Sequence, residues 1–506
     1  MTAVASARRG AADRGAAARR RVGRLLRTEA ALAWRFNVVL ATVVVTALWA
    51  VVLRVLDDPV RDALAPIVLL TDVTALGFLF VPALLVLERV EGVEAALRMT
   101  PVRVIERVGV RLGVTTSLSV AAATAVCVAA GLSDMAPRVL GVGLLSVLFG
   151  LVAFALTGSA TTLTAFLTRA PLVAAPLIAP ALAHLAGVAT APVLHVSPVT
   201  GAVDLLRGDL HVASVLWQLL WIAALALTVG RVLRRPLAAA AKAPSPAVDA
   251  RRSSSWPTHH GSYATAGAVR SFARADRRSL VRDGLLVMLV ASVPLLALVM
   301  RLIATAGVGW VRRRYGVALT PYLPLIEVVL LVVHTPVIFG SLTGLLLLED
   351  RDAGLFGPVM ATRAGLGTLL GYRLGATAAL TAGALLVSLP VDGVARPAGA
   401  AGVLATAVAA GAASVVPALL MAATARNRVQ GVAAMKMLGL PLYLPLATWA
   451  LEGPARLAFA PVPTTWAMWA SWASTPLAAV VAACGAIAVS AACAVPLARR
   501  FLHRAI

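Results

Sequence analysis

The chain has 506 residues, of which 60% are hydrophobic and 13% are charged, and its formal net charge is +23. Soluble domains average about 45–50% apolar and about 25% charged residues, so this composition excludes a soluble globular protein and indicates an integral membrane protein. In such a protein, a basic surplus marks cytoplasmic loops rather than a nucleic-acid partner. The only lysines are Lys242 and Lys436, and neither follows the glycines of a phosphate-binding loop. Any ATP-driven role therefore requires a separate protein.

Windows of about 20 mostly apolar residues predict membrane-spanning helices along the whole chain. The first half has six such windows, at 38–56, 65–87, 108–131, 139–167, 171–190 and 213–232. The second half also has six, at 285–306, 325–348, 366–390, 399–424, 430–450 and 474–498. The expected fold is therefore all-α and polytopic, with about twelve transmembrane helices.

Two stretches just before the first and seventh spans differ from both loops and spans. Residues 25–36 and 271–283 mix apolar side chains with arginines, and the first stretch includes Trp34. This pattern favours amphipathic helices in the membrane interface. The alternative is a solvated basic lead-in held by lipid headgroups.

The two halves are predicted to be internal repeats. Residues 233–269 are rich in Pro, Ser, Ala and Arg and have no apolar periodicity, so we expect a flexible basic linker between units 1–232 and 270–506. The segment after the second span, 87–99, matches the segment after the eighth, 348–360, at an offset of 261 positions. This alignment pairs Glu88 with Glu349 and Glu91 with Asp352; Arg111 matches Arg373 one inserted residue later.

Six spans per unit make both units enter the membrane from the same side, so the repeats are expected to be parallel. With both termini in the cytoplasm, most of the basic residues lie inside, which is the usual orientation in a cell membrane. Arg312, Arg313 and Arg314 are the exception, because this orientation leaves them outside, within a stretch that only the second half carries.

Charged residues inside predicted spans are costly and suggest a functional role. Asp72 and Glu327 are the two such acids that we single out. Either could line a translocation path or hold a cationic group of a substrate. The alternative is an ion pair, or a hydrogen bond to a neighbouring helix, near the headgroups.

The sequence contains no recognisable catalytic or metal-binding motif. The histidines of the spans and loops are dispersed, with no H-E-x-x-H pattern, and no G-x-S-x-G motif of a hydrolase occurs. We therefore expect no metal site, no catalytic residue and no cofactor. The histidines considered are His184, His195, His211 and His334. Two stretches before the sixth and twelfth spans, 193–200 and 461–466, could be re-entrant helices or ordinary loops.

Residues 88–101 resemble the E-x-E-G-T-x-E-x-L-x-x-T-P region of type-2 ABC exporter permeases, with Val93 where that family often has Thr. The six-span units, the interfacial helix and Asn427-Arg-Val-Gln430 before a Pro-interrupted span are also similar to that family. Residues 277–283, followed by an apolar run with Pro294, resemble in particular the actinobacterial drug-export permeases of the fluoroquinolone-export kind. The second copy of the acidic segment departs from the pattern, because Gly357-Pro358 lies inside it.

The resemblance implies a fused permease that exports a hydrophobic or amphipathic compound, such as a drug, an antibiotic or a lipid. ATP would be hydrolysed by a separate ATP-binding subunit, expected as a homodimer, so the chain itself would not be an enzyme. The segment after the second span would be the coupling helix that this subunit binds. The residues implied to contact the partner are Glu88, Glu91, Gly92 and Glu94, with Glu349 and Asp352 in the second copy. The alternative is that both segments are polar loop caps.

A second hypothesis is a proton-coupled secondary transporter of the major facilitator type. Such transporters also consist of two parallel six-span halves, and Asp350-Arg-Asp-Ala-Gly354 is similar to their D-R-x-G loop. The interfacial helices argue against this hypothesis, as does the lack of a similar signature at 88–92.

Overall fold

The computed structural model describes residues 2–505 apart from 74, 94–98, 101, 160–162, 186, 188–191, 235–283, 317 and 363–364. The described residues form helices and turns and contain no strand, which confirms the all-α fold. The chain divides into two compact units, Met1–Ser262 and Tyr263–Ile506, and each is described by itself. The predicted linker at 233–269 falls almost entirely outside the described residues, as does the basic stretch at 271–283.

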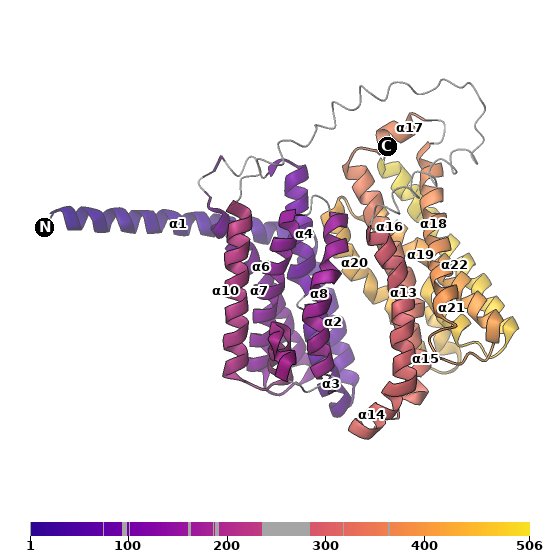
Figure 1. Cartoon of the computed structure of the whole chain (residues 1–506). Coiled ribbons are helices and arrows are strands. Elements are labelled where there is room, and N and C mark those ends of the chain that lie inside the picture. The colour runs from indigo at the N-terminus through magenta and orange to yellow at the C-terminus, as the bar shows by residue number, and fades with distance from the viewer. Residues whose placement is uncertain are drawn as a thin grey trace. The chain divides into compact units, whose positions relative to one another are not determined.

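The first unit begins with α1 (Thr2–Arg35), which runs crosswise to the long helices that follow it (Figure 1). Asn37 adopts a left-handed conformation, with φ of 59°, and turns the chain from α1 into the first span. Asparagine tolerates this region better than most residues. Glu29, Ala33 and Phe36 of this region are buried. The predicted helix at 25–36 falls within the longer α1 and its following turn, and its location in the membrane interface stays a prediction.

The remaining helices of the first unit are α2 (Val38–Val55), α3 (Asp58–Val68), α4 (Ala75–Val90), α6 (Val104–Ala130), α7 (Met135–Ser159), α8 (Leu163–Leu185), α9 (Pro198–Arg207) and α10 (Val212–Arg234). Five of these helices, α2, α6, α7, α8 and α10, each overlap a predicted span of their own.

The predicted span at 65–87 is not one regular helix. It comprises the end of α3, a π-helical turn at Leu69–Val73 and α4. Proline breaks the i to i−4 hydrogen-bond ladder, and Pro66 lies in α3 just before the π turn. A similar π-helical segment, Val328–Val333, lies within the corresponding second-unit span at 325–348. The described residues contain eleven helices long and apolar enough to cross a membrane, and residue 74, within the predicted span at 65–87, lies outside the described residues.

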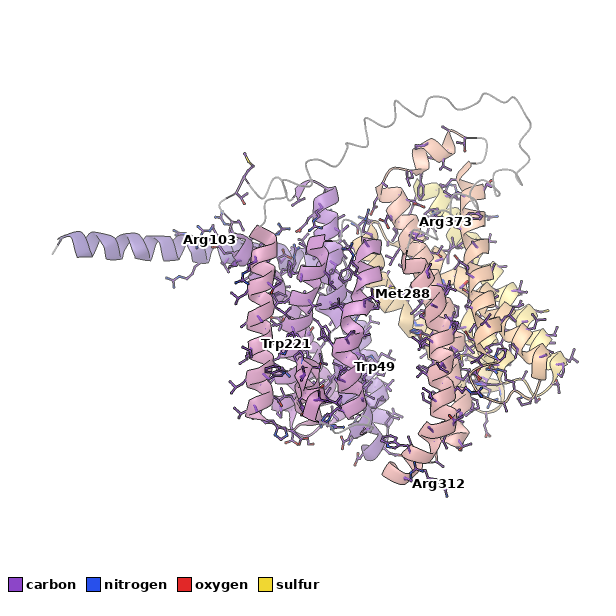
Figure 2. All side chains as sticks on the ribbon, viewed as in Figure 1. Trp49, Arg103, Trp221, Met288, Arg312 and Arg373 are labelled. Carbon is purple, nitrogen blue, oxygen red and sulfur yellow. The ribbon has the colours of Figure 1, made fainter. Side chains whose placement is uncertain are left out.

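The helices of the second unit follow an order similar to that of the first unit. They are α13 (Gly284–Leu302), α14 (Val308–Tyr315), α15 (Leu323–Glu327), α16 (His334–Asp352), α17 (Phe356–Met360), α18 (Gly365–Ser388), α19 (Gly399–Thr424), α20 (Arg428–Tyr443), α21 (Pro463–Ser471) and α22 (Pro476–Ala505). Within this unit, Arg312 of α14 lies at the opposite end from Arg373 of α18 (Figure 2).

The fourth span of each unit is its central helix. In the first unit, α7 packs against α4, α6, α9 and α10, and in the second, α19 packs against α16, α18, α21 and α22. Glycines permit the closest approach: a Cβ atom on Gly340 of α16 would lie 2.3 Å from the carbonyl oxygen of Ser414. Small residues at such crossings let membrane helices pack backbone to backbone.

The stretches before the sixth and twelfth spans are helical. All residues of α9 from Pro198 to Leu206 are buried, and α21 is also largely buried. Both short helices pack against the central helix of their own unit. The structure thus shows short, packed helices rather than irregular loops at both positions, and their insertion into the membrane stays a prediction.

Candidate functional site

A buried ion-pair cluster lies where α1 crosses the first unit. The guanidinium of Arg111 on α6 is 1% exposed and binds the carboxylate of Glu29 on α1. It also donates to both oxygens of Glu88 at the end of α4, at 3.0 and 2.5 Å. Two carboxylates from separate helices thus share one arginine. Paired and hydrogen-bonded charges of this kind are costly to disrupt, because removing one partner leaves the others buried without compensation.

Glu88 has a second cationic partner, Arg107, one turn before Arg111. Burial pushes the pKa of Glu88 upward, but the hydrogen bonds and charges of Arg111 and Arg107 outweigh this effect. The pKa of Glu88 is therefore lowered below its ordinary value, and the carboxylate stays ionised at neutral pH. These ion pairs anchor the end of α4 within the first unit.

Beyond Glu88 the chain turns away from the helix. Gly92 has a φ of 69°, the left-handed conformation that commonly ends a helix and that glycine adopts without strain. Glu91 and Gly92 are exposed. Arg89 donates to the carbonyl oxygen of Thr157 at 2.9 Å, which ties this turn to the end of α7. Glu94, the remaining acid that was implied to contact a partner, lies outside the described residues.

The second unit repeats this anchor, but in a register that corrects the alignment. Arg373 pairs with Asp350 at 3.2 Å, and the two are 23 residues apart, as are Arg111 and Glu88. The structural counterpart of Glu88 is therefore Asp350, 262 positions later, and not Glu349. Gly354, with φ of 71°, likewise corresponds to Gly92.

One further donor follows the register of 262. Arg351 donates to the carbonyl oxygen of Ala425 at 3.0 Å, as Arg89 donates to that of Thr157. Glu91 then corresponds to Ala353 instead of Asp352. The alignment of the two halves placed the one-residue insertion after the acidic segment. The contacts shared by the two units place it before that segment.

Glu349 and Asp352 of the second unit both face α20. Arg428 lies 3.6 Å from the carboxylate of Glu349 and donates to Asp352 at 3.3 Å. The short helix α17 follows, and its Phe356 is buried edge-on against Phe501, with ring centroids 5.7 Å apart. Leu355 and Met360 are exposed beside it, at 49% and 40%. The second unit therefore presents exposed apolar side chains beside α17, whereas residues 94–98 of the first unit lie outside the described residues.

Glu327 and Asp72 are the two acids singled out within the predicted spans. Glu327 is 1% exposed, and its carboxylate accepts hydrogen bonds from Arg396 at 2.7 Å and from Ser471 at 3.2 Å. Asp392 shares the same guanidinium. This geometry matches the ion-pair alternative for Glu327. Asp72 lies in the π turn, and its side chain is outside the described residues.

Each unit contains a hollow lined by large side chains. In the first unit, a hollow of about 360 Å³ lies among α7, α8 and α10 and is lined by apolar residues, including Leu148, Val173 and Trp221. In the second, a hollow of about 630 Å³ is lined by Trp466, Trp469 and Trp472 with Arg456. Concave apolar sites with few polar groups are typical of small-molecule binding.

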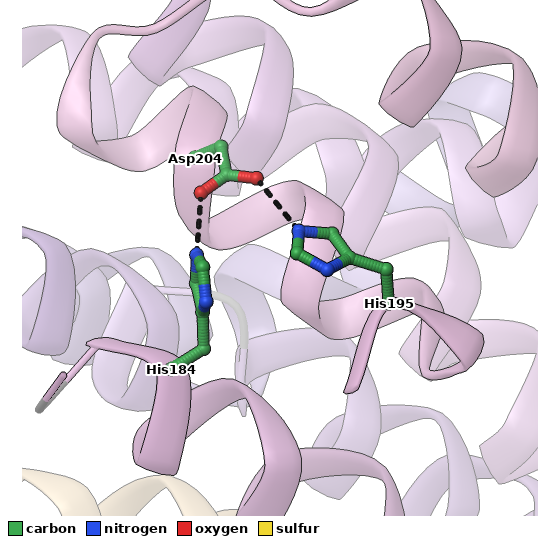
Figure 3. Close-up of side chains that lie close together, drawn as sticks. All are labelled: His184, His195 and Asp204. Carbon is green, nitrogen blue, oxygen red and sulfur yellow. Dashed lines mark hydrogen bonds and ion pairs between the residues drawn. The ribbon is translucent and has the colours of Figure 1, made fainter. Parts of the chain in front are cut away.

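Two histidines that are dispersed in the sequence come together with Asp204 in the first unit. His184, at the end of α8, and His195 both face the carboxylate of Asp204 on α9 (Figure 3). His184 and Asp204 are 20 residues apart, and no sequence spacing rule links them.

Two family models match the chain, one in each half. A model described as the fluoroquinolones export permease protein family matches residues 20–241, and one described as fluoroquinolones export permease protein Rv2686c-like matches residues 276–498.

Two relatives from Mycobacterium tuberculosis (strain ATCC 25618 / H37Rv) are similar to this chain. Fluoroquinolones export permease protein Rv2686c is 31% identical over 201 residues, which cover 40% of this chain and 80% of the relative. Fluoroquinolones export permease protein Rv2687c is 29% identical over 196 residues, which cover 38% of this chain and 83% of the relative. Each match thus spans most of a relative but less than half of this chain, which fits a fusion of two permease units. This chain belongs to the fluoroquinolones export permease family.

Proposed function

We propose that this chain is the membrane-spanning subunit of an ABC exporter, with ATP hydrolysed by a separate ATP-binding subunit. The observation that carries the proposal is the repeated anchor: after the second span of each unit, an acid binds an arginine 23 residues later, and a left-handed glycine ends the helix. A fixed helix end with an exposed turn beyond it suits docking of a soluble partner. One such segment per unit agrees with a homodimer of the ATP-binding subunit, one copy on each.

In the proposed coupling, the residues of the first unit's segment have two different roles. Glu88 anchors the end of α4, while the exposed Glu91 and Gly92 contact the partner, together with Glu94. Because Arg111 holds both Glu88 and Glu29, a displacement of this segment would move α4, α6 and the crosswise helix α1 together. In the second unit, the surface around α17 takes this role, flanked by Glu349 and Asp352.

We place both termini and both coupling segments in the cytoplasm of a cell. The basic side chains near α1 and near the end of α22 support this orientation, because Lys and Arg accumulate on the cytoplasmic side. Arg312 lies at the opposite end of its unit from Arg373 and would face outward.

The transported compound is proposed to be hydrophobic or amphipathic and to be moved out of the cell. The hollow of the first unit suits an aliphatic group, and that of the second suits a planar aromatic group on its tryptophans. The relatives are named for fluoroquinolones, which contain planar aromatic rings. Asp72 remains a prediction for the translocation path. For Glu327 we propose the alternative role of a buried ion pair, because Arg396 and Ser471 bind its carboxylate.

Copurification with the ATP-binding subunit tests the proposal. We expect Glu91→Arg to weaken the complex without lowering the thermal stability of the permease, because Glu91 is exposed. The double variant Glu88→Ala with Glu91→Ala should weaken it further. Glu452→Arg is the matched control, since Glu452 is exposed in the second unit away from the coupling segments.

A transport assay in vesicles separates this proposal from the secondary transporter. Export that requires both ATP and the ATP-binding subunit supports the proposal. Export driven by a proton gradient without that subunit would overturn it.

A further inference from the structure

We propose that His184, His195 and Asp204 form a binding site for one divalent transition-metal ion, with Zn²⁺ as the expected ligand. The Nε2 atom of His184 lies 2.9 Å from Oδ1 of Asp204, and Nε2 of His195 lies 3.5 Å from Oδ2 (Figure 3). All three ligand atoms lie within 4.8 Å of one another.

The separations between the ligand atoms are close to those found around a bound metal ion. Zn–N and Zn–O bonds are about 2.0–2.1 Å, so neighbouring ligand atoms in a tetrahedral site are separated by about 3.3 Å. The two distances to Asp204 lie on either side of this value but end on different carboxylate oxygens, and the three ligand atoms, one from each residue, lie within 4.8 Å of one another. Small rotations of the two imidazole rings would therefore admit an ion, and water would complete the coordination.

The backbone around the three residues is fixed by hydrogen bonds. Arg207, one turn after Asp204, donates to the carbonyl oxygen of Leu185 at 2.7 Å, which caps the end of α8 beside His184. Ser197 caps α9 and donates to Leu177 of α8 at 2.6 Å. Arg138 of α7 holds the other end of α9 through Leu206, at 2.7 Å. The ligand-bearing elements are thus positioned in advance, which lowers the entropic cost of binding.

The chemistry of the set favours a transition metal. Imidazole nitrogens suit Zn²⁺, Cu²⁺ and Ni²⁺, whereas Mg²⁺ and Ca²⁺ prefer oxygen ligands. Asp204 supplies a mostly buried carboxylate, and in the described structure its ion-pair partners are these two histidines. The side chain of His195 is 41% exposed and offers an entry path for the ion. A metal would neutralise the carboxylate without requiring either imidazole to be protonated.

One feature limits the expected affinity. Metal-binding histidines usually donate their other ring nitrogen to a carboxylate or carbonyl oxygen, and Nδ1 of His184 is buried with no such partner among the described residues. We therefore expect binding roughly 10- to 100-fold weaker than at a fully supported site.

The site lies at the end of the first unit opposite the coupling segment. Arg138, at the start of α7, contacts the end of α9, whereas Arg89 of the coupling segment contacts Thr157 at the far end of α7. The second unit has only His334 and His503, so it contains no corresponding set. A bound ion would link α8, the turn with His195 and α9, and would hold the inserted helix α9 in place in this unit alone.

Zn²⁺ titration of the full-length permease tests the site. The protein is purified without a histidine tag, with His259 and His260 of the linker replaced by alanine, and stripped with a chelator. We expect one saturable Zn²⁺ site by calorimetry, a rise in thermal stability with Zn²⁺ but not with Mg²⁺, and visible d–d absorption when Co²⁺ is bound. His195→Ala and Asp204→Asn should each abolish the site.

Two controls keep the result interpretable. His211→Ala removes an exposed histidine outside the set and should retain the saturable site. His195→Ala changes a half-exposed side chain, so the unliganded variant should unfold at the same temperature as its parent. Equal Zn²⁺ stoichiometry and affinity in the parent, His195→Ala and Asp204→Asn would overturn the proposal and leave a hydrogen-bonded His–Asp–His cluster.

Discussion

The carboxylate of Glu88 accepts one hydrogen bond from each terminal nitrogen of Arg111, at 3.0 and 2.5 Å. Such a two-bond pair fixes orientation as well as distance. Because Arg111 also binds Glu29, the pair joins the end of the second span to the third span and to the crosswise helix α1.

Replacing Arg111 by methionine should strongly destabilise the first unit. The substitution leaves Glu29 and Glu88 partly buried without this cation, and breaking such a pair costs about 3–5 kcal/mol. Arg373→Met in the second unit should cost less, because the Arg373 side chain is 22% exposed and that of Arg111 only 1%. Thermal unfolding in detergent measures the stability loss of each variant. Equal losses would show that burial does not set the strength of the anchor.

The Glu88 anchor should weaken in acid. Its pKa in the folded protein lies below the ordinary value of 4.5, because Arg111 and Arg107 outweigh the effect of burial. A lowered folded pKa contributes stability that is present above pH 4.5 and is lost as the pH falls through the folded value. We expect the stability difference between the parent and Glu88→Gln to be constant near neutral pH and to shrink below pH 4.5. Thermal unfolding over this range provides the test, and a difference independent of pH would contradict it.

Gly92→Ala should destabilise the turn through backbone strain alone. A Cβ atom at Gly92 meets no heavy atom within 4 Å, but φ of 69° disfavours any other L-residue by about 1 kcal/mol. Gly354→Ala should behave alike, with φ of 71°. Gly109→Ala is the control, since it lies inside α6 and also meets nothing within 4 Å. The control should be neutral or slightly stabilising in the same unfolding assay.

Gly340→Ala should destabilise the second unit by overpacking. The added Cβ atom would lie 2.3 Å from the backbone oxygen of Ser414 and 2.5 Å from Pro417, so α16 and α19 must separate. Such changes cost about 1–3 kcal/mol. Gly371→Ala, on an exposed part of α18 with nothing within 4 Å, is the matched control. A Gly340→Ala variant as stable as this control would show that the helix crossing is looser than described.

Glu327→Gln should fold and export normally, whereas Arg396→Met should be unstable. Two buried carboxylates, Glu327 and Asp392, share the single guanidinium of Arg396, so neutralising one leaves a balanced pair. Removing the arginine leaves both acids uncompensated. Export of a cationic compound and thermal unfolding, measured together, test this role. If the Glu327→Gln variant lost export but kept its thermal stability, the result would contradict the ion-pair role and would indicate that Glu327 lines the translocation path.

The coarse architecture was predictable because the membrane imposes it. Each span must supply about 20 apolar residues, so the predicted ranges at 108–131 and 399–424 agree with α6 and α19. Hydropathy does not register the π-helical turns within the predicted spans at 65–87 and 325–348, because a π turn changes the hydrogen-bond pattern and not the composition. The acidic segment and its likeness to the export permeases were likewise recognisable from local sequence, since both are continuous in the chain.

By itself, the sequence determined the membrane class, the family and the two-unit layout, all of which depend on local composition and contiguous motifs. Only the tertiary structure decided which residues share a site. It paired Arg111 with Glu29, 82 residues away, moved the counterpart of Glu88 from Glu349 to Asp350, and brought His184 to His195 and Asp204. Ion pairs and metal ligands depend on distances between atoms, and helices that are far apart in sequence acquire those distances only by packing together.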